Sequence, residues 1–148
     1  MTERPSRPVI VVGVDGSEPS IAALRWAAQQ ARVTDADIDA VSGWDVPISI
    51  MWVPTYTEED YARDARQTLD RAVAEALGPE PGVHIEKHLV QKRPAHALTD
   101  AAEGAQLLVI GHHGRGELPG MHLGSVASYC VHHAPCPVVV VRGRHTGR

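Results

Sequence analysis

The sequence predicts an α/β protein built on one parallel sheet with helices on both of its faces. Strand-like apolar runs alternate with segments of helical spacing, in the order β-α-β-α-β-α-β-α-β. This alternation is typical of parallel sheets with right-handed crossovers. The runs Val9–Val14 and Val138–Val141 are almost entirely apolar, which suits strands covered on both faces. With 148 residues, the chain is long enough for one domain with a substantial core.

The overall composition excludes several classes of protein. A net charge of −4 argues against nucleic-acid binding, which usually needs a basic face. No apolar run approaches the roughly 20 residues of a membrane helix, and residues 1–8 lack the apolar core of a signal peptide. We therefore expect a cytoplasmic protein without nucleic-acid or membrane partners. The expected organisation is a flexible arm at 1–7, one domain at 8–143 and a tail at 144–148.

The first strand, Val9–Val14, leads into a turn with a possible ligand-binding role. Ser17 is a good N-cap for a helix that helical spacing places at about 18–33. Asp15 therefore lies at the carboxyl end of the first strand, where open α/β sheets bind ligands. The alternative is that Asp15 only forms the turn before Ser17. Asp37–Trp44 is the expected second strand.

The middle of the chain contains a loop, a long helix and an edge strand. Val46–Tyr56 combines apolar residues with prolines and is predicted to be a loop. Thr57 followed by Asp60 resembles a capping box, which opens a helix that continues to about Ala76. Val83–Val90 alternates apolar and polar residues, which favours a less buried third strand near an edge of the sheet.

The last third supplies two helices and two strands. A short helix over 94–102 precedes the fourth strand, Leu107–Ile110, and a further helix is expected at Ser125–His133. The final strand, Val138–Val141, would be prone to pairing if it lay at an edge. We therefore expect a homodimer joined through this strand. The alternative is a strand buried between helices of its own chain.

The stretch from 111 to 126 is the best candidate for a binding site. Its glycines, at 111, 114, 116, 120 and 124, follow a strand and precede a helix. Backbone N–H groups of such a loop and the positive end of the helix dipole favour anions, so a phosphate-bearing ligand is expected. The stretch has no Gly-Lys-Ser/Thr of a Walker loop. It is also not the dinucleotide Gly-x-Gly-x-x-Gly, which belongs after a first strand.

The spacing Gly111-x2-Gly114-x9-Gly124-Ser125 resembles the ATP-binding branch of the universal stress protein family, and it matches at all four fixed positions. Residues 11–17 are similar to the first strand and turn of that family. Residues 136–141 are similar to its terminal strand, and Pro94-Ala95 with Leu98 to the start of its third helix. The resemblance thus covers nearly the whole chain.

The resemblance implies a Rossmann-like sandwich with strand order 3-2-1-4-5, in which Asp15 lies beside the glycine-rich loop. It also implies ATP as the ligand. If a metal ion is present, we expect Mg²⁺ carried by the ATP phosphates. The implied nucleoside contacts are Gly13, Val14, Asp15 and Gly43. The implied ribose and phosphate contacts are Gly111, Gly114, Arg115, Gly116, Gly124, Ser125 and Val126. Strand two departs from the family in ending Ser42-Gly43-Trp44, so the selectivity for the base stays open.

Several of these residues have alternative interpretations. Arg115 suits a phosphate partner but could equally be a solvated loop residue. Ser125 could donate to a phosphate, cap its helix, or do both. His112 and His113 lie in the ligand loop and could tune phosphate affinity near neutral pH.

The nine histidines do not form a metal-binding pattern in the sequence. His84 and His88 share one face of a strand but are too far apart to chelate easily. We therefore expect no metal site beyond Mg²⁺ carried with ATP. The predicted function is a non-catalytic, ATP-binding regulator of the stress response that acts through a protein partner. A slow ATP hydrolase and a nucleotide-free protein-interaction module are the alternatives.

Overall fold

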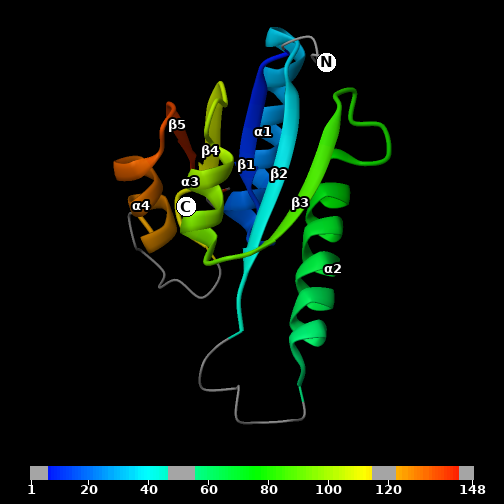
Figure 1. Ribbon diagram of the computed structural model, residues 1–148. Coiled ribbons are helices and arrows are strands. Elements are labelled where there is room, and N and C mark those ends of the chain that lie inside the picture. The colour runs from blue at the N-terminus through cyan, green and yellow to red at the C-terminus, as the bar shows by residue number, and fades with distance from the viewer. Residues whose placement is uncertain (1–6, 47–55, 115–122, 144–148) are drawn as a thin grey trace, which may run out of the picture.

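A computed structural model describes residues 7–46, 56–114 and 123–143 of the protein. Within these ranges the chain forms five strands and four helices in the predicted alternating order (Figure 1). In chain order they are β1 (Val9–Gly13), α1 (Glu18–Thr34), β2 (Asp37–Trp44), α2 (Glu58–Leu77), β3 (Ile85–Gln91), α3 (Pro94–Ala101), β4 (Leu107–Gly111), α4 (Ser125–His133) and β5 (Val138–Val141).

The five strands form one parallel sheet in the order β3-β2-β1-β4-β5, which confirms the predicted fold. Helices α1 and α2 pack on one face, and α3 and α4 pack on the other (Figure 1). Alternate residues of the central strand serve the two layers, since Ile10 and Val12 belong to the first core and Val11 to the second. The sequence run of apolar residues in β1 follows from this burial on both faces.

Two helix starts confirm capping predictions from the sequence. The Ser17 hydroxyl accepts a hydrogen bond from the Ser20 N–H at 3.3 Å. At α2, Thr57 Oγ1 accepts from the Asp60 N–H at 3.1 Å, and Asp60 Oδ2 accepts from the Thr57 N–H at 2.8 Å. The hydrogen bond from the Thr57 backbone, followed by that from Arg63, holds the pKa of Asp60 below its usual value.

Strand β5 lies at one edge of the sheet, and all four of its valines are half-buried. Val139 and Val141 pack toward the α1 layer, whereas Val138 and Val140 pack toward the α4 layer. The strand is therefore apolar on both faces because a helical layer lies on each side. It is not enclosed on its outer edge by another strand of the described chain.

Parts of three predicted segments lie outside the described residues. These are 1–6 of the expected arm, 47–55 of the expected loop and all of the expected tail at 144–148. Arg7, at the end of the expected arm, donates hydrogen bonds to Asp35 at 3.3 Å and Asp37 at 3.0 Å. None of the helices described is both long enough and apolar enough to cross a membrane.

Candidate functional site

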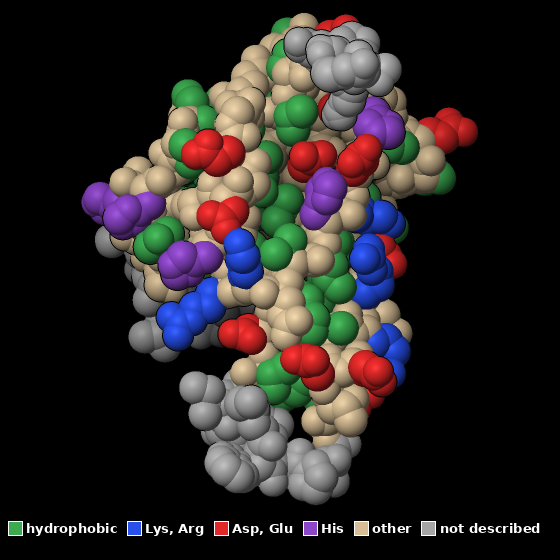
Figure 2. Space-filling model, viewed as in Figure 1, with side chains coloured by type: hydrophobic (Ala, Val, Ile, Leu, Met, Phe, Trp, Pro, Cys, Tyr) green, Lys and Arg blue, Asp and Glu red, His purple; other side chains and the backbone are tan. Residues whose placement is uncertain are grey.

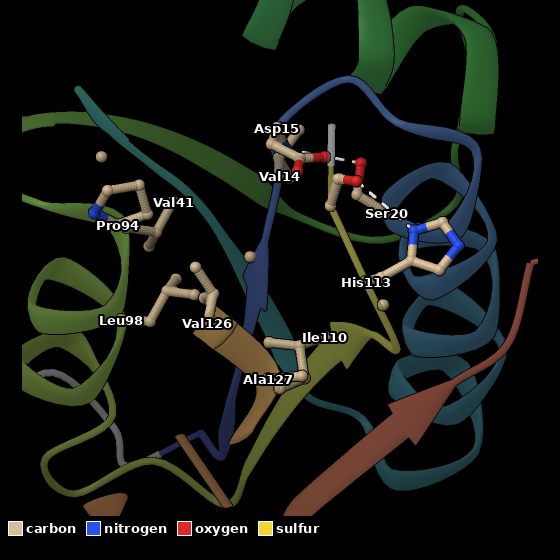
Figure 3. Close-up of a pocket in the computed structure, with 14 residues that line it drawn as sticks. Val14, Asp15, Ser20, Val41, Pro94, Leu98, Ile110, His113, Val126 and Ala127 are labelled. Carbon is tan, nitrogen blue, oxygen red and sulfur yellow. Dashed lines mark hydrogen bonds between the residues drawn. The ribbon is translucent and has the colours of Figure 1, made fainter. Parts of the chain in front are cut away.

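A cavity of about 270 Å³ opens at the carboxyl ends of β1 and β4 (Figure 3). These neighbouring strands lead to helices on opposite faces of the sheet, so the chain leaves a crevice between them. Such a switch point is where open α/β sheets bind ligands. The cavity is lined by Gly13, Val14, Asp15, Ser20, Val41, Gly43, Pro94, Leu98, Ile110, Gly111, His113, Gly114, Val126 and Ala127.

Asp15 both forms the turn after β1 and borders the cavity. Its Oδ1 accepts hydrogen bonds from the Ser17 N–H at 2.9 Å and from the Ser17 hydroxyl at 2.5 Å. The Asp15 N–H points at Ser20 Oγ, 3.4 Å away. The neighbouring Val14 N–H donates to the Val41 carbonyl at 2.9 Å, which fixes the turn to β2. The two interpretations of Asp15 are therefore compatible, because the turn uses one oxygen and directs the carboxylate to the cavity rim.

Gly114 lies directly against this carboxylate. A Cβ atom added to Gly114 would overlap Asp15 Oδ2, so only a glycine allows the loop backbone to approach so closely. The structure thus brings Asp15 beside the start of the glycine-rich loop, as the family resemblance implied. His113 also lines the cavity, and its Nδ1 lies 3.3 Å from the Gly114 carbonyl oxygen (Figure 3).

Backbone hydrogen bonds close the base of the glycine-rich loop. The Gly124 N–H donates to the His112 carbonyl at 2.7 Å, and the His112 N–H donates to the Val141 carbonyl at 2.9 Å. The loop is therefore anchored to the sheet at both of its ends. His112 serves this anchor and is not among the residues that line the cavity.

Gly124, rather than Ser125, is the N-cap of α4. Ser125 is the first helical residue and is exposed, so the capping interpretation of its hydroxyl is wrong. A glycine at the N-cap has no side chain that can accept from the first N–H groups. These groups and the positive end of the helix dipole are consequently better placed to serve an external acceptor. Val126 and Ala127 of the same turn reach the cavity wall.

Three other predicted glycines are explained by packing around the cavity. A Cβ atom on Gly13 would lie 2.7 Å from Leu98 Cδ1, and one on Gly111 would lie 2.6 Å from Pro19 Cβ. A Cβ atom on Gly43 would lie 2.8 Å from Pro94 Cα. These contacts let helices α1 and α3 approach the strand ends closely. Glycine at these positions therefore shapes the cavity, whether or not it also touches a ligand.

Most of the predicted site residues meet in one place. Eight line the cavity: Gly13, Val14, Asp15, Gly43, Gly111, His113, Gly114 and Val126. His112, Gly124 and Ser125 are described but lie outside its lining. Arg115 and Gly116 lie outside the described residues.

Sequence reasoning missed the apolar wall of the cavity. Val41, Leu98 and Ile110 face the cavity from β2, α3 and β4 (Figure 3). Val41 and Ile110 lie near the carboxyl ends of predicted strands. Because ligands bind at these ends, this position could have indicated that both residues line the cavity. Leu98 belonged to a segment similar to the family but had been given no role in the site.

Cys130 of α4 belongs to the same apolar cluster as Val41, Leu98 and Ile110. It is completely buried, and burial raises the pKa of its thiol to about 11. The thiol therefore stays protonated at neutral pH and packs as a small apolar group.

The fold and the site define a doubly wound α/β protein with a small-molecule cavity at its switch point. Within this class, the chain belongs to the universal stress protein family, because the model of that family matches residues 7–142. A universal stress protein of Mycolicibacterium smegmatis is 37% identical over 141 residues, which cover 90% of this chain and 48% of the relative. The chain thus spans about half the length of the curated relatives it matches.

Solved structures similar to the chain include nucleotide complexes. A universal stress protein from Archaeoglobus fulgidus in complex with dAMP is 27% identical, with a TM-score of 0.67 over 92% of this chain and 98% of that one. A universal stress protein in complex with cAMP is 26% identical, with a TM-score of 0.60 over 94% of this chain and 99% of that one. Two proteins similar to this chain therefore bind adenine nucleotides.

Proposed function

We propose that this chain is an ATP-binding regulatory protein of the stress response that holds the nucleotide without hydrolysing it. The observation that carries the proposal is the contact between Gly114 and Asp15 at the rim of the cavity. Through this contact, a fixed glycine of the family's loop pattern and the turn after β1 line the same pocket. The dAMP and cAMP complexes of similar proteins support an adenine nucleotide. The loop spacing supports ATP in particular.

The chemistry of the cavity fits a nucleoside at its sheet end. Val41, Leu98 and Ile110 offer an apolar surface for the base, and the Asp15 carboxylate is a strong acceptor for ribose hydroxyls. The phosphates would then extend toward the first turn of α4, where the N–H groups and the exposed Ser125 hydroxyl can donate. Mg²⁺ would be held through the phosphates, as it usually is in nucleotide sites.

The hydrolase alternative places a different demand on Asp15. As a general base or metal ligand, its carboxylate would have to act on a water beside the phosphates. Its Oδ1 already accepts two hydrogen bonds from Ser17. This favours a fixed acceptor over a group that exchanges protons during turnover. A nucleotide-free interaction module would have no need for the close approach of Gly114 to Asp15.

Calorimetric titration of nucleotide-free protein with ATP, ADP, AMP and cAMP, paired with a phosphate-release assay, tests the proposal. We expect one ATP per chain, the strongest affinity for ATP, and no phosphate release during prolonged incubation. Preferred binding of AMP or cAMP would contradict the ATP assignment. Steady phosphate release that is lost in an Asp15→Ala variant would favour the hydrolase, and no binding at all would favour the interaction module.

We also propose that the protein forms a homodimer through β5. The half-buried valines support the proposal, and so does the outer edge of this strand, which pairs with no other strand of the described residues. The Pro137 and Val141 carbonyls accept hydrogen bonds from the Leu108 and His112 N–H groups. Because the backbone groups of successive residues point to opposite sides of a strand, the Val140 N–H points to the outer edge. Val140→Pro should remove this outward donor while preserving the bonds to β4. We expect light scattering to give twice the chain mass of 15.9 kDa for the wild type and the single chain mass for the variant. A monomeric wild type would contradict the dimer.

A further inference from the structure

A polar patch occupies the part of the sheet that α3 and α4 leave uncovered. Acidic and histidine side chains gather there over β2 and β3 (Figure 2). Three of them, Asp39, Glu86 and His88, direct ligand atoms at one another, and these atoms all lie within 4.8 Å. This cluster is separate from the glycine-rich loop and from Asp15, and the proposed function makes no use of it.

The register of the sheet builds the cluster. Asp39 of β2 pairs with Glu86 of β3, and His88 follows Glu86 by two residues. Because side chains alternate along a strand, all three project from the same face. The residues between them serve the opposite layer, where Ala40 joins the core and Lys87 pairs with Asp70 of α2 at 2.8 Å. The polar set is therefore held by two paired strands rather than by a loop.

The distances in the cluster leave room for a metal ion between the three side chains. His88 Nε2 lies 3.4 Å from Asp39 Oδ1 and 3.6 Å from Glu86 Oε1. An N–H···O hydrogen bond normally spans about 2.7 to 3.2 Å. Ligand atoms that surround a tetrahedral Zn²⁺ at about 2.0 to 2.1 Å are separated by about 3.3 to 3.4 Å, the edge of that tetrahedron.

The environment of His88 Nε2 gives a second observation. The imidazole ring is partly exposed, but Nε2 itself is shielded from solvent. Among the described residues it makes no hydrogen bond, and its contacts are the two carboxylate oxygens at 3.4 and 3.6 Å. The atom points toward two carboxylates, so a cation between the three groups would satisfy all of them.

We propose that Asp39, Glu86 and His88 bind a divalent transition-metal ion, with Zn²⁺ as the best match. One imidazole nitrogen and two carboxylate oxygens are ligands that Zn²⁺ accepts, and three protein ligands leave a fourth position for water. Asp39 and His88 also line a cavity of about 340 Å³ beside α3, which gives this fourth position room. The Lys92 ammonium in the same cavity pairs with Asp100 at 2.5 Å and does not neutralise the cluster.

The cluster differs from a pair of histidines on one strand, which is the pattern that the sequence offers. His84 and His88 are the histidines on this face, and four residues of strand separate them by about 13 Å. In the proposed site, Glu86 of β3 and Asp39 of β2 supply the ligands that a second histidine would supply in a histidine pair. Only the register between the two strands reveals that replacement.

Equilibrium dialysis of the untagged, nucleotide-free chain against Zn²⁺ alone tests the site. His84→Ala is the matched control, because His84 also contacts Glu86, at 3.4 Å, from the same face but lies outside the three ligands. We expect His88→Ala and Asp39→Asn to lose one bound equivalent of Zn²⁺ relative to the wild type, and His84→Ala to retain it. Unchanged thermal melting without metal would show that each variant still folds.

A spectroscopic measurement checks the coordination independently of the other histidines. Co²⁺ bound to three protein ligands and a water should give a visible absorption spectrum of near-tetrahedral type. Excess Zn²⁺ should remove this spectrum, and His88→Ala should lack it. The proposal is overturned if the equivalent of Zn²⁺ persists in His88→Ala, if it is lost equally in His84→Ala, or if the wild type binds no metal ion.

Discussion

Replacing Gly114 by alanine should weaken ATP binding without unfolding the protein. Gly114 lies in the described loop without a positive backbone φ, so alanine introduces no backbone strain there. The new Cβ atom would overlap Asp15 Oδ2. Either the loop or the carboxylate must move, and the carboxylate is held by two hydrogen bonds from Ser17. The substitution therefore disturbs the contact proposed to position the ribose.

The size of the effect follows from the interaction that is displaced. A hydrogen bond to a charged group contributes about 1.5 to 3 kcal/mol, and each 1.4 kcal/mol is a factor of about ten in affinity. We therefore expect the Kd for ATP to rise by about ten- to a hundredfold in Gly114→Ala. The midpoint of thermal unfolding without nucleotide should change little, because the loop lies at the surface of the site.

A double-mutant cycle with Asp15→Ala separates this cause from a general disturbance of the loop. Without the carboxylate there is nothing for the Cβ atom introduced by Gly114→Ala to displace. This substitution should therefore cost much less affinity in the Asp15→Ala background than in the wild type. Calorimetric titration of the four proteins with ATP provides the measurement. Normal ATP binding by Gly114→Ala, or the same loss with and without the carboxylate, would refute the reasoning.

Further predictions concern the packing at Gly43 and the reactivity of the two thiols. Gly43→Ala should destabilise the fold by about 1 to 3 kcal/mol in urea denaturation, because its Cβ would lie 2.8 Å from a backbone atom of α3; unchanged stability would contradict this packing. Burial raises the pKa of Cys130 to about 11 and also raises that of Cys136, so both stay mainly protonated at pH 8. Because only Cys136 is accessible, a thiol reagent should titrate one thiol in the native protein and two in denaturant; two rapidly reacting native thiols would contradict the burial of Cys130.

The sequence was sufficient to predict the secondary structure because its local signals agree with the fold. Two predicted capping residues, Ser17 and Thr57, cap helices in the structure, and the apolar run at β1 forms a strand there. Strand order was different, since apolar periodicity does not say which strands are neighbours. The resemblance to the universal stress protein family supplied that order, and with it the proximity of Asp15 to Gly114.

What the sequence could not supply depends on close approach and register. Ser125 looked like a cap, but the backbone places Gly124 at that position and leaves the hydroxyl exposed. Leu98 comes to the cavity because α3 packs against Gly13, a contact between distant segments. In the same way, Asp39 and Glu86 meet only through the pairing of β2 with β3. Such contacts are set by tertiary packing and leave no periodic trace in the chain.

We propose that the cavity between β1 and β4 holds intact ATP. Its most direct test is to purify the protein under native conditions, denature it, and identify the released nucleotide by chromatography. We predict release of intact ATP from the wild type and much less from Gly114→Ala. Release of ADP or AMP in place of ATP, or equal ATP from both proteins, would contradict the claim.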